Sequence, residues 1–144
     1  MEPTGEAREA AEVDAARRHL LEAGADRLAR QPWQPSWAPP DDATLLRFAV
    51  RQAGAGVGRV EHADVRAALA LVETAREDLD ALESALILIA RAEGLTWPDI
   101  ARQLRVRTPQ AAQQRFRRVS TRVEAAREGA GGGDEADDEE AVRQ

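Results

Sequence analysis

The sequence contains no cysteine, which excludes disulfide bonds and cysteine-based metal sites. Its two histidines, His19 and His62, lie far apart in the chain and form no recognisable cluster of metal ligands. No serine or histidine has an arranged catalytic partner in sequence. We therefore expect no catalytic residues, no metal and no cofactor.

Long apolar runs are also missing. No apolar run exceeds six residues, as at 85–90, which is too short to cross a bilayer, and the N-terminus lacks the basic stretch followed by an apolar one that marks a secretory signal. Alternation of apolar and polar residues never persists, so strands are not expected. These absences predict an all-α, cytoplasmic protein without a membrane partner.

Lysine is absent as well, and all 20 basic residues are arginine. Codon bias in a GC-rich genome explains this, but arginine also offers a planar fork of donors that suits phosphate and guanine. Although the net charge is −6, residues 94–122 contain seven arginines and one acid, Asp99. A concentrated basic patch on an acidic chain is typical of a DNA-binding protein.

Helix and linker signals divide the chain into five parts. A first helix or arm occupies residues 1–31, with Thr4 as its cap, and a linker rich in proline and tryptophan covers 32–42. A helical body spans 43–93, a two-helix unit spans 94–127, and an acidic tail that we expect to be disordered spans 128–144. Trp33 and Trp37 are expected to pin the linker onto the body, with a partner-docking strap as the alternative.

A long helix is predicted over residues 62–93. Its apolar residues recur as two heptad series, which comprise Val65, Val72, Leu79 and Leu86, and Ala68, Ala75, Leu82 and Ile89. Such a pattern suits a bundle helix or the seam of a homodimer. The acids Asp78, Asp80 and Glu83 on this helix are interpreted as a solvated face.

Two short capped helices follow. Gly94 ends the long helix, Thr96 and Asp99 cap the next one, and Thr108 followed by Pro109 starts a third. Two helices joined by a turn of three or four residues are typical of a helix-turn-helix, whose second helix enters the major groove.

The outer face of that second helix, about 109–126, carries the candidate DNA contacts. Glutamine pairs with adenine and arginine with guanine, whereas other arginines hold phosphates. The candidate residues for base reading are Arg107, Thr108, Gln110, Gln113 and Arg117, and those for phosphate are Arg102, Arg105, Arg118 and Arg122. Gln114 lies on the same outer face and is a further candidate DNA contact.

The segment 94–119, GLTWPDIARQLRVRTPQAAQQRFRRV, resembles the helix-turn-helix of small actinobacterial transcriptional regulators, some labelled regulators of small heat-shock genes. It is also similar to region 4 of sigma factors. The resemblance places Gln110 and Gln113 on the recognition helix. Two positions depart from the family pattern: Arg105 stands where glycine is usual, and Pro109 replaces an arginine.

Two functions remain in competition at this point. The first is a nucleoid-associated transcriptional regulator that binds double-stranded DNA as a homodimer through the long helix. The second is a protein-interaction module that binds RNA polymerase or a sigma factor through the long helix or the tryptophan strap.

Overall fold

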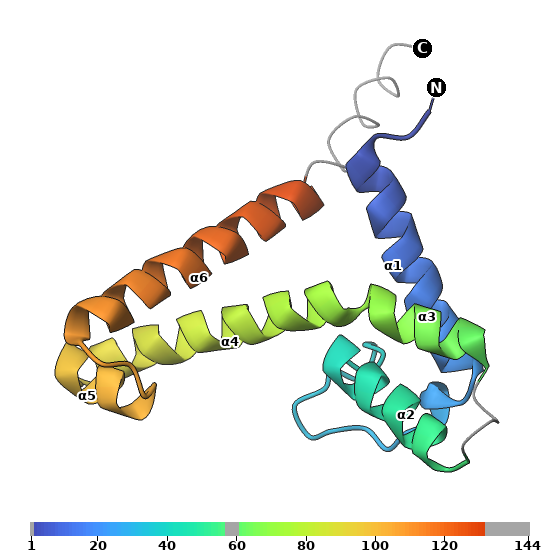
Figure 1. Ribbon diagram of the computed structural model, residues 1–144, viewed down its shortest axis with the longest axis horizontal. Coiled ribbons are helices and arrows are strands. Elements are labelled where there is room, and N and C mark those ends of the chain that lie inside the picture. The colour runs from blue at the N-terminus through green and yellow to red at the C-terminus, as the bar shows by residue number, and fades with distance from the viewer. Residues whose placement is uncertain (1, 57–60, 132–144) are drawn as a thin grey trace. The chain divides into compact units, whose positions relative to one another are not determined.

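The computed structural model describes residues 2–56 and 61–131 (Figure 1). Within these residues the secondary structure is entirely helical, as predicted. The chain divides into two compact units, residues 1–76 and 77–144, and the helix α4 (Val72–Ala92) belongs to both. Most of the acidic tail lies outside the described residues.

The first unit contains α1 (Gly5–Glu22), the single 3-10 turn η1 (Ala25–Arg27), α2 (Asp42–Gly54) and α3 (His62–Ala70). The predicted first helix is too long, because Gly24 adopts a φ of 127° and terminates it. Thr4 caps α1 as expected, and Asp41 accepts a hydrogen bond from the Thr44 N–H at the start of α2. The core of this unit consists of Ala16, Leu20, Ala25, Leu45, Ala67 and Leu71.

The predicted helix over residues 62–93 is broken at Leu71. This residue is fully buried in the core of the first unit, and its backbone leaves the regular helical conformation with φ −93° and ψ 0°. The Leu71 N–H donates to the Ala68 carbonyl, three residues back, at 3.0 Å, and the Thr74 hydroxyl donates to the Leu71 carbonyl oxygen at 3.1 Å. The break therefore separates α3 from α4 and lets Leu71 pack inward.

A buried ion pair connects α1 to the first residue of α2. The Arg17 guanidinium donates two hydrogen bonds of 2.8 Å to the Asp42 carboxylate, which is only 4% exposed. Burial by itself raises the pKa of the Asp42 carboxyl, but hydrogen bonds from Arg17 and Thr74 lower it below its usual value. The first unit thus depends on a charged Asp42.

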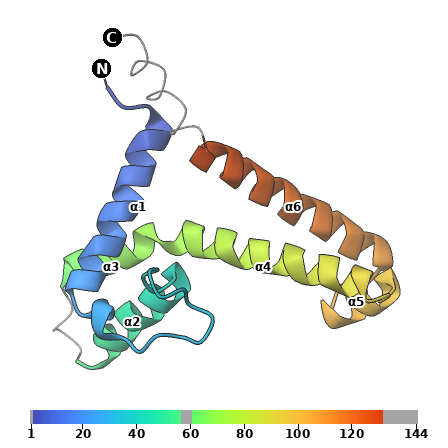
Figure 2. The same ribbon diagram turned by 180° about the vertical axis from the view of Figure 1, so that it is seen from behind.

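The second unit contains the rest of α4, the short helix α5 (Trp97–Gln103) and α6 (Pro109–Gly131). After α5, α6 runs in the direction opposite to α4 (Figures 1 and 2). The sequence predicts that this last helix ends at residue 126, but α6 continues for five more residues and includes the start of the expected tail. The core of the unit consists of Ile87, Ile100, Ala101 and Ala112, surrounded by Ala90, Trp97, Leu104, Val106 and Phe116.

Candidate nucleic-acid interface

The two turns on either side of α5 share one backbone motif. After α4, the Leu95 and Gly94 N–H groups donate to the carbonyls of Ala90 and Arg91, and Gly94 has a φ of 87°. This is a Schellman turn, in which a left-handed residue closes the helix. The turn sets the angle at which α5 leaves α4.

The turn after α5 repeats this pattern without glycine. The Val106 N–H donates to the Ala101 carbonyl and the Arg105 N–H to the Arg102 carbonyl. Arg105 occupies the left-handed position with a φ of 56°, and it is the single non-glycine residue with positive φ in the described chain. A glycine at this position would relieve that strain.

Side-chain caps begin both helices. The Thr96 hydroxyl accepts a hydrogen bond from the Asp99 N–H, while the Asp99 carboxylate accepts one from the Thr96 N–H. The Thr96 hydroxyl also donates to the Asp99 carboxylate, and this hydrogen bond, together with that from the Thr96 N–H, holds the pKa of the Asp99 carboxyl below its usual value. At α6 the Thr108 hydroxyl accepts from the Ala111 N–H at 3.0 Å. All three predicted caps, at Thr4, Thr96 and Thr108, are therefore confirmed.

The crossing of α5 and α6 is close because its central residues are small. Ala101 and Ala112 are both almost fully buried in the shared core. At one side the rings of Trp97 and Phe116 lie 6.0 Å apart between centroids, and the Arg91 guanidinium lies 5.3 Å from the Trp97 ring centroid. This packing fixes which face of α6 points to solvent.

The candidate base-reading residues lie largely on that outer face. Six of the predicted DNA contacts are exposed and have no ion pair within the described chain; these are Arg105, Arg107, Gln110, Gln114, Arg117 and Arg118. Gln113 is half-buried, since it lies toward the core side of α6. The exposed Thr108 has its hydroxyl engaged in the helix cap.

The other two candidates lie in ion pairs. Arg102 lies 3.5 Å from the carboxylate of Asp99 on its own helix. Arg122 lies 3.1 Å from the carboxylate of Asp80 on α4. Both guanidinium groups therefore have a partner before any ligand binds.

A third pair was not foreseen from the sequence. The Arg115 guanidinium donates two hydrogen bonds, of 2.5 and 2.8 Å, to the Glu83 carboxylate, and this partner raises the pKa of Arg115 above its usual value. The interpretation of Asp80 and Glu83 as a solvated face was wrong, because their side chains are only 18% and 15% exposed and face α6. The signal available in the sequence was that Asp80 and Glu83 are three residues apart on α4 and Arg115 and Arg122 seven apart on α6, so that each pair lies on one face of its helix.

The apolar surface of α4 is left open in a single chain. Leu79, Leu82, Leu86 and Ile89 are 58–65% exposed and follow one another at intervals of three and four residues. We call these four residues the α4 strip. A groove of about 460 Å³ lies beside it, lined by apolar side chains of α4 and α5 that include Leu95, Ile100 and Leu104.

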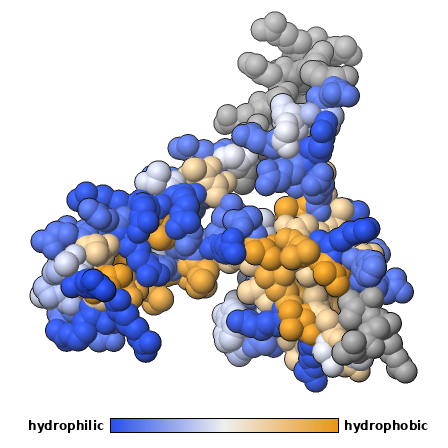
Figure 3. All heavy atoms as spheres, viewed as in Figure 1, coloured by the Kyte–Doolittle hydropathy of each residue, from blue (hydrophilic) through white to orange (hydrophobic). Residues whose placement is uncertain are grey.

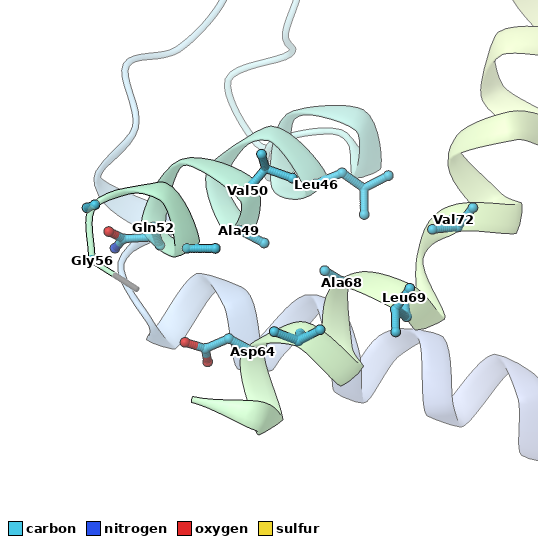
Figure 4. Close-up of a pocket in the computed structure, with 12 residues that line it drawn as sticks. Leu46, Ala49, Val50, Gln52, Gly56, Asp64, Ala68, Leu69 and Val72 are labelled. Atoms are coloured by element: carbon cyan, nitrogen blue, oxygen red, sulfur yellow. The ribbon is translucent and has the colours of Figure 1, made fainter. Parts of the chain in front are cut away.

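The first unit carries a second apolar groove, of about 600 Å³ (Figure 4). Leu46, Ala49 and Val50 of α2 lie opposite Ala68 and Leu69 of α3 across it. The space-filling view shows apolar side chains gathered over these two helices (Figure 3). Apart from Gln52 and Asp64, the side chains that line this groove are apolar.

The tryptophans of the linker do not pin it to the helical body, contrary to the expectation. Trp33 is 75% exposed and Trp37 is 84% exposed. The linker is held instead by local hydrogen bonds, among them that from the Gln34 amide to the Ala38 carbonyl at 2.8 Å. The exposure of Trp33 and Trp37 favours the alternative role of a docking strap.

Comparisons with known proteins place the chain in no established family. No protein-family model, no curated protein and no solved structure matches it. Within the described residues, no group of acids and histidines is arranged to hold a metal ion, and no helix has the length and apolarity needed to cross a membrane. The interface on α6 is therefore the candidate site with the most specific arrangement.

Proposed function

We propose that α5 and α6 form a helix-turn-helix and that the protein is a transcriptional regulator that binds double-stranded DNA. The observation that carries this proposal is the outer face of α6, where Gln110, Gln114, Arg117 and Arg118 project from a helix anchored by a small buried core. Amide and guanidinium groups are the side chains that read adenine and guanine in the major groove. The resemblance of residues 94–119 to actinobacterial regulators supports the same function.

The turn before α6 supplies the remaining contacts. Arg105 and Arg107 are exposed on either side of Val106, close to the N-terminus of α6. The first turn of a recognition helix carries most base contacts, and its free N–H groups favour a phosphate. In this arrangement Gln110 and Gln114 read bases, while Arg105 and Arg118 hold the backbone on the two sides of the groove.

The test is binding to a pool of random duplex DNA at several salt concentrations. The variant R107A/Q114A/R117A should lose at least 100-fold in affinity for the selected duplex, since each good bidentate base contact contributes about 1–3 kcal/mol. The matched control R8A/R18A removes two equally exposed arginines from α1 and should bind within about twofold of the wild type. Equal affinity of the triple variant and this control would refute the proposed interface.

We further propose that the DNA-binding form is a homodimer joined through the α4 strip. The strip contains four large apolar side chains and no charge, so its chemistry fits an identical strip on a second copy. A leucine from one copy would enter the groove that lies between α4 and α5 of the other. Two recognition helices related in this way would meet half-sites about one helical turn apart.

The second candidate function is a protein-interaction module that binds RNA polymerase or a sigma factor. The observation in its favour is the exposure of Trp33 and Trp37, because tryptophan is the residue most often found at binding hot spots. A W33A/W37A variant that keeps DNA affinity but loses a complex with purified polymerase would favour a combined role. Absence of duplex binding by the wild type at low salt, together with such a complex, would favour this function alone.

A further inference from the structure

Four arginines of α6 differ in whether they have a carboxylate partner. Arg117 and Arg118 are exposed and have no ion pair in the described chain, whereas Arg115 and Arg122 are bound to carboxylates of α4. Residues seven apart lie on the same face of a helix, and Arg115 and Arg122 share such a face. The acidic side of α4 therefore lies along one flank of the proposed recognition helix.

Asp80 is fixed in place by its neighbours. Its carboxylate lies 3.1 Å from the Arg122 guanidinium, and one turn away Glu83 holds Arg115 with two hydrogen bonds. Between them the hydroxyls of Ser84 and Ser120 lie 3.0 Å apart and hydrogen bond to each other. These contacts hold α4 and α6 together in one register, so that Asp80 stays beside Arg122.

A phosphate and a carboxylate compete for the same guanidinium. Both are anions that accept hydrogen bonds from arginine, and the negative charge of Asp80 beside Arg122 opposes the approach of a phosphate to this guanidinium. Arg122 is 63% exposed at its side chain, so DNA is not excluded from it by burial. The Asp80 carboxylate is 18% exposed, and displacing Arg122 would cost this partly buried charge its ion-pair partner.

We infer that Asp80 withholds Arg122 from DNA, so that α4 sets the affinity of the interface by occupying an arginine that would otherwise bind phosphate. This inference rests on the proposed function. The Asp80 carboxylate takes the place beside Arg122 that a DNA phosphate would otherwise occupy. The protein should therefore bind DNA of unrelated sequence more weakly than its number of arginines suggests.

The experiment compares the salt dependence of duplex binding among single variants. Each phosphate that a protein neutralises makes the plot of log affinity against log salt steeper by about 0.9. D80N should therefore steepen this slope by about 0.9, because Arg122 becomes available. R122Q should leave the wild-type slope unchanged, and R118Q should make it shallower by about 0.9.

Two further variants separate this effect from a general change in charge. E77Q removes the same charge from an exposed position on α4 and should leave the slope unchanged. In the double variant D80N/R122Q the gain from D80N should disappear. Helix content and melting of each variant, measured by circular dichroism, show whether the fold is retained.

The inference is overturned if D80N leaves the slope unchanged, if E77Q steepens it equally, or if R122Q makes it as shallow as R118Q does. Where D80N does not fold, the comparison of R122Q with R118Q decides alone, and equal slopes in these two variants overturn the inference. A wild-type protein that binds no duplex at low salt refutes the proposed function itself, which is a separate outcome.

Discussion

The homodimer proposed for the α4 strip can be tested by shortening one of its side chains. Leu86 is 65% exposed in a single chain. Replacing it by alanine removes about three methylene-sized groups, worth about 0.8 kcal/mol each when buried. Scaled by the exposed fraction, the loss is about 1.6 kcal/mol for each copy and about 3 kcal/mol for a symmetric dimer, which contains the substitution twice.

A loss of about 3 kcal/mol weakens the dimer roughly 150-fold, because each 1.4 kcal/mol is a factor of ten. Sedimentation equilibrium of the wild type and of L86A over a wide concentration range measures this difference. The matched control is L69A, since Leu69 on α3 is 67% exposed and lies outside the strip. A wild type that stays monomeric throughout, or an L69A variant that dissociates as readily as L86A, would refute the argument.

Three further predictions follow from single contacts. R105G should stabilise the second unit by about 0.5–1 kcal/mol in chemical denaturation, because glycine adopts the left-handed conformation at residue 105 without strain. R105A should give no such gain, and stabilisation by R105A would contradict the strain at this position. E83Q should destabilise the second unit by about 1–2 kcal/mol. This is less than for a fully buried ion pair, because the Arg115 side chain is 40% exposed. An unchanged melting curve would contradict a structural role for the Glu83–Arg115 pair. The pKa of Asp42 is lowered in the folded state, so the contribution of the charged carboxylate to stability is complete above the unfolded pKa of about 4 and is lost as the pH falls further. The wild type should therefore lose stability in acid more steeply than D42N. Parallel pH profiles of the two melting temperatures would contradict this.

The local signals in the sequence were sufficient for the end of α4 and for the starts of α5 and α6. Thr96, Thr108 and Gly94 act through hydrogen bonds and backbone angles within a few residues, so their effect can be predicted without knowing the fold. Arg105 was singled out differently, through the resemblance, because it stands where glycine is usual; the structure gives it a φ of 56°.

The break at Leu71 could not be predicted in this way. Nothing in its neighbourhood disfavours a helix, because neither glycine nor proline is present between residues 62 and 93. The break exists because Leu71 contributes to a core whose other members come from α1, η1 and α2 as well as α3. A heptad pattern records that a position is apolar, but it does not say which surface the side chain joins.

The basic patch of residues 94–122 has the same limit: the sequence shows that a position is charged, but not which residue its side chain contacts. The seven arginines of residues 94–122 predict a strongly basic surface, but three of them, Arg102, Arg115 and Arg122, have carboxylate partners. Arginines two positions apart, such as Arg115 and Arg117, lie on nearly opposite sides of a helix, so their partners differ although their sequence neighbours are similar. Four arginines remain for DNA, and at about 0.9 per phosphate they limit the arginine-dependent salt slope to about 3.6 for each chain. A measured slope near 6, as all seven would give, would show that DNA opens the ion pairs of α4 and α6.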